Sequence, residues 1–157
     1  ALGGDYRLDG NLPYDCEGFV RLKYGTWESE TDLKAQPELN YGTNVRLIRM
    51  GDVYLMAAEA NYFAGNEVVA RQYLDSITTR AKITPIASAG AQLLEDIKHQ
   101  RQVELAFEGF RLADLIRWGD AAAVLGSKGF QAKHALYPIP QKELDLNKNM
   151  VQSTLWR

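Results

Sequence analysis

The chain has 157 residues, of which 46% are hydrophobic, and its 18 Lys and Arg face 20 Asp and Glu for a net charge of -2. This size and apolar content suit one folded domain with a buried core and exclude a disordered chain. Because acidic and basic residues nearly balance, the chain has no basic surplus to attract phosphates, and we expect no nucleic-acid partner. No apolar run is long enough for a membrane span.

The first zone, residues 1–44, is predicted to be an irregular loop region, because it is rich in Gly, Pro, Asn and Asp. One short strand is expected at Phe19–Tyr24, where the side chains alternate with the period of a strand. So long a loop is unusual in an isolated domain and indicates that further chain covers it.

The second zone, residues 45–126, has the periodicity of helices. We predict them at about residues 46–63, 67–81, 91–108 and 110–125. Small residues at Ala57, Ala58 and Ala70 allow close antiparallel helices, as in a tetratricopeptide-type hairpin. The predicted fold class is therefore all-α, with tetratricopeptide-like helical hairpins (an α-solenoid piece) and long ordered loops at both ends, although another helical bundle would share much of this pattern.

The third zone, residues 127–157, is predicted to be a C-terminal loop and tail with a short turn at Gln141–Leu146.

One stretch, RQVELAFEGFRLADLIRWGD at 101–120, combines alternating charges with large apolar groups. Its charged residues are Arg101, Glu104, Glu108, Arg111, Asp114 and Arg117. They suit either an active site with paired carboxylates or an ionic clamp that holds the fold together.

The helical spacing favours the clamp. A stripe through Leu94 and Ile97 continues to Arg101, Glu104 and Glu108, so these charges should face inward. Glu104 and Glu108 lie one turn apart, as acid–base catalysis in a glycan hydrolase would need. However, the flanking arginines keep carboxylates ionised, and buried charges survive only when paired, so we interpret the six residues as a structural ionic clamp.

Other catalytic or metal sites find little support. His99 and His134 are far apart and lack cysteine partners, so no metal site is predicted. There is no phosphate-binding loop and no nucleophile motif, and we expect no cofactor. The single cysteine, Cys16, excludes an internal disulfide and follows no apolar signal core that would mark a lipidation site.

Three blocks of sequence are similar to a known family: RLIRMGDVYLMAAEAN (46–61), RQVELAFEGFRLADLIRWGD (101–120) and HALYPIPQKELDLN (134–147). In order and spacing they closely resemble the C-terminal region of the SusD/RagB family, and with FVRLKY (19–24) the resemblance covers about residues 19–157. The end of the chain departs from the family, whose members often finish on Gln-Asn-Pro-Gly-aromatic where this chain has QSTLW (152–156).

The resemblance implies a non-enzymatic protein of the bacterial cell surface. Family members are outer-membrane lipoproteins of Bacteroidetes-type bacteria that capture a nutrient, usually a glycan and in some branches a peptide. They close as a lid over a SusC-type TonB-dependent barrel. They are also several times longer, so we expect this chain to be a C-terminal segment whose lipid anchor and much of whose ligand site lie elsewhere.

Aromatic residues of the first zone are the candidate ligand contacts. Tyr14, Trp27 and Tyr41 each stand near polar groups, as sugar stacking requires, and Trp27 is the strongest candidate because its indole offers the largest face. Each single ring has packing as its simpler explanation. The alternative function is a tetratricopeptide-like adaptor that binds a peptide or protein partner.

Overall fold

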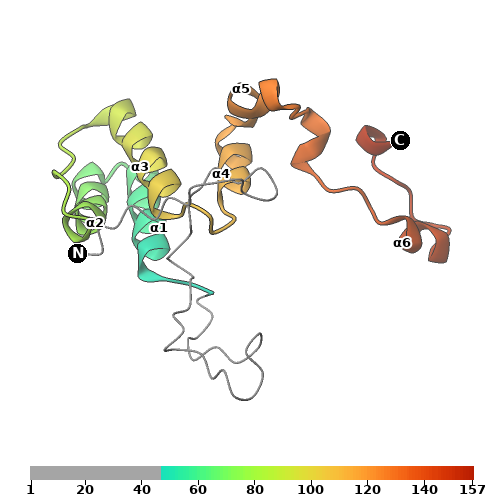
Figure 1. The fold of residues 1–157 in the computed structure, drawn as a ribbon, viewed down its shortest axis with the longest axis horizontal. Coiled ribbons are helices and arrows are strands. Elements are labelled where there is room, and N and C mark those ends of the chain that lie inside the picture. Colours follow the sequence, from blue (N-terminus) through green and yellow to red (C-terminus); the bar gives the residue numbers. More distant parts are fainter. Residues whose placement is uncertain (1–46) are drawn as a thin grey trace, which may run out of the picture. The chain divides into compact units, whose positions relative to one another are not determined.

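The computed structural model describes residues 47–157, whose helical elements are shown in Figure 1. The α-helices are α1 (Met50–Phe63), α2 (Glu67–Arg80), α3 (Gly90–Glu104), α4 (Arg111–Trp118), α5 (Ala121–Leu125) and α6 (Gln141–Leu146). Three short 3-10 helices follow α5, namely η4 (Gly126–Lys128), η5 (Ala132–Ala135) and η6 (Thr154–Trp156). Within residues 47–157 there is no strand, so the all-α class is confirmed for this part; the strand predicted at 19–24 lies outside it.

Helices α1, α2 and α3 share one apolar core. Its buried members are Leu55, Ala58, Ala70, Leu74, Ile77, Leu93, Ile97 and Leu105. Tyr54 of α1 and Tyr73 of α2 pack beside it with ring centroids 5.8 Å apart. Of the small residues expected at the α1–α2 contact, Ala58 and Ala70 are thus in the core. A tetratricopeptide-type repeat stays a prediction.

Side chains of α2 form hydrogen bonds with the backbone of the connection from α2 to α3. Arg71 donates from Nη1 to the carbonyl of Ser88 at 3.1 Å, and Glu67 accepts from the amide of Gly90 at 3.1 Å. Asp75 accepts from the amide of Ile86 at 3.3 Å. These bonds satisfy backbone groups of the loop and fix where α3 begins.

The predicted helix over 110–125 is wrong in one respect, because the chain breaks at Gly119 into α4 and α5. Gly119 has φ +79°, in the left-handed region that glycine tolerates best. Its amide donates to Ile116 at 3.1 Å and the next amide, of Asp120, donates to Leu115 at 2.9 Å. This is the Schellman pattern of a helix end. The helix predicted over 91–108 likewise ends earlier, at Glu104.

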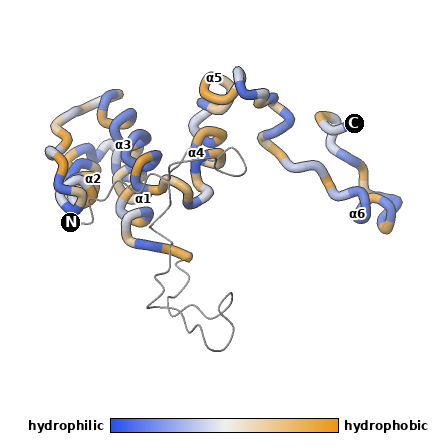
Figure 2. Tube along the Cα trace, viewed as in Figure 1, coloured by the Kyte–Doolittle hydropathy of each residue, from blue (hydrophilic) through white to orange (hydrophobic). Residues whose placement is uncertain are grey.

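The tail over residues 126–157, all of which the structure describes, contains no buried residue. The short helix expected at Gln141–Leu146 is present as α6. Local hydrogen bonds hold the rest: Gln152 accepts from the amide of Ile139 at 3.1 Å and donates to its carbonyl at 2.9 Å. Figure 2 shows that hydrophobic positions recur along this tail as they do along the helices.

Candidate functional site

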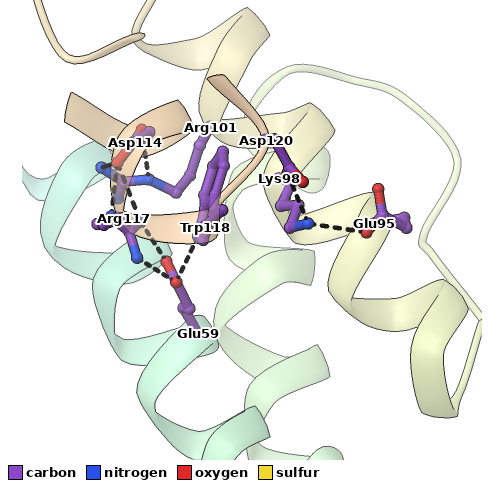
Figure 3. Close-up of polar contacts among 8 residues, drawn as sticks. All are labelled: Glu59, Glu95, Lys98, Arg101, Asp114, Arg117, Trp118 and Asp120. Carbon is purple, nitrogen blue, oxygen red and sulfur yellow. Dashed lines mark hydrogen bonds and ion pairs between the residues drawn. The ribbon is translucent and has the colours of Figure 1, made fainter. Parts of the chain in front are cut away.

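A buried ion pair joins α3 to α4. Arg101 donates to Asp114 through Nε at 3.0 Å and through Nη2 at 3.1 Å, a two-bond arrangement that fits the planar guanidinium (Figure 3). The two side chains are only 4% and 7% exposed. Such a pair costs desolvation energy but is strongly destabilising to break, because the partner left behind is a buried charge.

Arg117 extends this pair to α1. Its Nε donates to Asp114 at 3.0 Å, and its Nη2 donates to Glu59 at 2.6 Å, with a second contact from Nη1 to the same carboxylate (Figure 3). The indole Nε1 of Trp118 donates to Glu59 at 2.8 Å. Glu59, Arg101, Asp114 and Arg117, which we call the ion-pair cluster, therefore link three helices.

The electrostatics keep Glu59 charged. Burial alone would raise the pKa of its carboxyl, but hydrogen bonds from Arg117 and Trp118 outweigh burial and hold the pKa below its ordinary value. The hydrogen bond to Glu59 in turn raises the pKa of Arg117. A carboxyl held ionised in this way suits an ion pair and is unsuited to general acid catalysis, which needs a raised pKa.

A second set of charges lies on the other side of Trp118. Lys98 of α3 contacts Asp120 at 2.9 Å and Glu95 at 3.0 Å (Figure 3). The hydrogen bond to Asp120 raises the pKa of Lys98 despite its partial burial. The indole of Trp118 thus has two cations near its ring, the Arg117 guanidinium carbon at 4.6 Å from the centroid and Lys98 Nζ at 5.5 Å.

The structure places the six predicted clamp residues in different surroundings. Arg101, Asp114 and Arg117 come together, whereas Glu104 contacts Arg80 of α2. Arg111 has no carboxylate within salt-bridge distance among residues 47–157, so Arg111 and Glu108 do not form an ion pair with each other. The inward stripe of α3 runs through Leu93 rather than Leu94, which is half-buried.

Glu59 was missed by the sequence analysis because 58 residues separate it from Arg117. Its helical position held a signal, since Glu59 follows the buried Leu55 by one turn and so falls on the core face of α1. Trp118 is half-buried, and its indole nitrogen is hydrogen-bonded to Glu59.

Two hollows adjoin these charges. The first, which we call the α3–α5 hollow, measures about 350 Å³ and is lined by residues of α3, α4 and α5, among them Lys98, Trp118 and Asp120. The second measures about 480 Å³ and lies at the α3–α4 connection beside Phe107 and Phe110. Arg111 lines both.

The aromatic candidates Tyr14, Trp27 and Tyr41 lie outside the described residues. Over residues 47–157, no group of three or more His, Cys, Asp and Glu side chains is arranged to hold a metal ion. In the same range, no helix combines the length and apolar character needed to cross a membrane.

Comparison with known proteins identifies the family. The family model of the SusD family matches residues 13–134, which is most of the chain. The chain belongs to the SusD family. The resemblance to the SusD/RagB family is thereby confirmed, and the match includes the blocks at 46–61 and 101–120.

Individual relatives of this SusD-family chain agree. SusD-like protein P25 of Formosa agariphila is 30% identical over 95% of this chain and 31% of its own length. SusD-like protein P38 of the same organism is 26% identical over 82% of this chain and 29% of its own. The chain thus spans less than a third of these relatives.

A solved structure is also similar. A laminarin-binding SusD-like protein shares 38% identity and a TM-score of 0.65 with this chain, over 80% of this chain and 26% of that protein. The two proteins are therefore similar in sequence as well as in fold.

Proposed function

We propose that the protein binds a glycan without cleaving it, as the lid component of a SusC/SusD-type uptake complex. The observation that carries this is the likeness to a laminarin-binding SusD-like protein, at 38% identity and a TM-score of 0.65. The proposed setting is the outer membrane of the cell, where a lipid anchor outside this chain would hold the protein against a SusC-type TonB-dependent barrel.

The absence of catalysis is proposed from the state of the carboxylates. A glycan hydrolase needs one carboxyl protonated near neutral pH and a second one ionised within a few ångströms. Here Asp114 and Glu59 are engaged by arginines, and the pKa of Glu59 is lowered. Glu104, one member of the carboxylate pair considered from the sequence, contacts Arg80 instead.

The ligand contacts proposed within this chain are Trp27, Tyr14 and Tyr41. An aromatic face next to hydrogen-bonding side chains suits the C–H face of a sugar ring. Flat rings also stack on aromatic side chains with little dependence on which ring it is, as nucleic-acid bases do. The larger part of the glycan site is proposed to lie in the two thirds of the relatives' length that this chain does not span.

Calorimetry on the full-length protein tests the proposal. Laminarin oligosaccharides, other glycans and a set of peptides would be titrated, and each mixture assayed for new reducing ends. We expect glycan binding without reducing-end release, and a loss of about tenfold in affinity for Trp27→Ala, the scale of one lost stacking contact. Tyr137→Ala is the matched control, since Tyr137 is an aromatic residue 91% exposed in the tail.

Three results would count against parts of the proposal. Release of reducing ends would show a hydrolase. Binding of peptides alone would favour the adaptor. Undiminished glycan binding by Trp27→Ala would remove Trp27 from the site.

A further inference from the structure

The α3–α5 hollow has the size of a small ligand site. Its volume of about 350 Å³ falls at the low end of the range for ligand pockets in proteins, roughly 300–1,000 Å³. It is therefore large enough for a short piece of a glycan, of about one or two sugar rings, and too small to enclose a longer oligosaccharide.

Part of its wall is fixed by contacts within the protein. Lys98 contacts both Glu95 and Asp120, at 3.0 and 2.9 Å, so the single cation partly neutralises these two acids. The indole of Trp118 is held in place by its hydrogen bond to Glu59. A wall held in this way is preorganised, which lowers the entropy cost of binding.

The rest of the wall has unused hydrogen-bonding groups. His99, Gln102 and Arg111 line the hollow, and none of them makes a side-chain hydrogen bond or ion pair with another residue in 47–157. Arg111 is half-buried, and no carboxylate lies within salt-bridge distance of it among residues 47–157. The groups left to meet a ligand are thus the guanidinium of Arg111 and the polar side chains of His99 and Gln102.

We propose that the α3–α5 hollow binds an acidic sugar residue of the glycan, with its anionic group on Arg111. A guanidinium pairs through two parallel hydrogen bonds with a carboxylate or with an oxyanion such as a sulfate ester. Gln102 and His99 both donate and accept, which suits the hydroxyl groups of the same ring. This inference rests on the proposed glycan-binding function and names the kind of sugar that the protein selects.

The test compares acidic and neutral oligosaccharides on the full-length protein. Calorimetry would use an oligoglucuronate, a 6-sulfated glucose oligosaccharide and the matching glucose oligosaccharide. We expect at least one acidic ligand to bind more tightly than the neutral one, and Arg111→Gln to lower that affinity about tenfold or more, a larger loss than for the neutral ligand. Lys142→Gln, which removes an exposed cation of α6 away from the hollow, should change neither affinity.

Thermal melting would establish that Arg111→Gln folds like the parent, as expected for a side chain that forms no ion pair within residues 47–157. Binding of only one acidic ligand supports the inference and identifies its anion as a carboxylate or a sulfate. Equal affinity for acidic and neutral ligands, or an unchanged affinity in Arg111→Gln, overturns it while the proposed glycan binding stands. Failure to bind any oligosaccharide overturns both.

Discussion

The helices over residues 54–125 and the tail over residues 126–157 use the same kinds of residue in different ways. Both are rich in large apolar side chains, but some of those in the helices form a buried core, whereas the tail has no buried residue and Leu136, Tyr137, Leu146 and Leu155 are exposed. Charges differ too, since Arg101 and Asp114 of the helices are buried together, whereas the exposed Asp145 of α6 accepts a hydrogen bond from the nearby Gln141. Burial rather than composition therefore decides which residues stabilise the fold.

The largest expected difference between the regions concerns a single aspartate. Asp114→Ala removes the shared partner of two arginines and should lower the free energy of unfolding by about 3–5 kcal/mol, the cost of breaking a buried ion pair. Asp145→Ala, its match in the tail, should stay within about 0.5 kcal/mol because the residue is exposed. Urea denaturation measures both, and equal effects would remove the distinction between the regions.

Two leucines offer the same comparison for apolar burial. Leu74 is fully buried in the core of α1–α3, and Leu74→Ala should lower the free energy of unfolding by about 2–5 kcal/mol. Leu146 is 73% exposed, so Leu146→Ala should have little effect on the free energy of unfolding of this chain. A large loss for Leu146→Ala in the full-length protein, but not in this chain alone, would show that further chain covers the tail.

The acid dependence of stability should trace to Glu59. Its pKa is lowered in the folded state, so its stabilising effect is present above the unfolded pKa of about 4.3 and is lost as the pH falls through the folded value. Glu59→Gln should lower the free energy of unfolding at pH 7 by about 1–3 kcal/mol. Denaturation curves between pH 7 and pH 3 should show the difference from the parent shrinking; a constant difference would contradict the ionised pair.

Among the charged residues of the helices, the smallest effect is expected at Glu104. Its partner Arg80 is 61% exposed and can return to water, so Glu104→Gln should lower the free energy of unfolding by only about 0–1 kcal/mol through that contact. A loss as large as that of Asp114→Ala would place Glu104 among the residues that hold the helices together.

Helical periodicity predicted much of this fold, and its failures have physical causes. The boundaries of α2 came out within one residue, because Gly65-Asn66 marks its start. The break at Gly119 was missed because the apolar pattern runs on through Ala121, and only the backbone conformation at the glycine shows that the helix ends. Glu59 could not be paired with Arg117 from spacing, since spacing reports neighbours within a helix and not contacts between helices.

A double-mutant cycle on Arg101 and Asp114 tests most directly whether the charges of residues 101–117 are structural. The two single alanine variants and the double variant would be unfolded in urea, and the coupling energy taken from their free energies of unfolding. For two buried side chains joined at 3.0 and 3.1 Å, we expect a favourable coupling of about 1–3 kcal/mol. A coupling near zero would contradict the ion-pair cluster and return these residues to the search for a functional role.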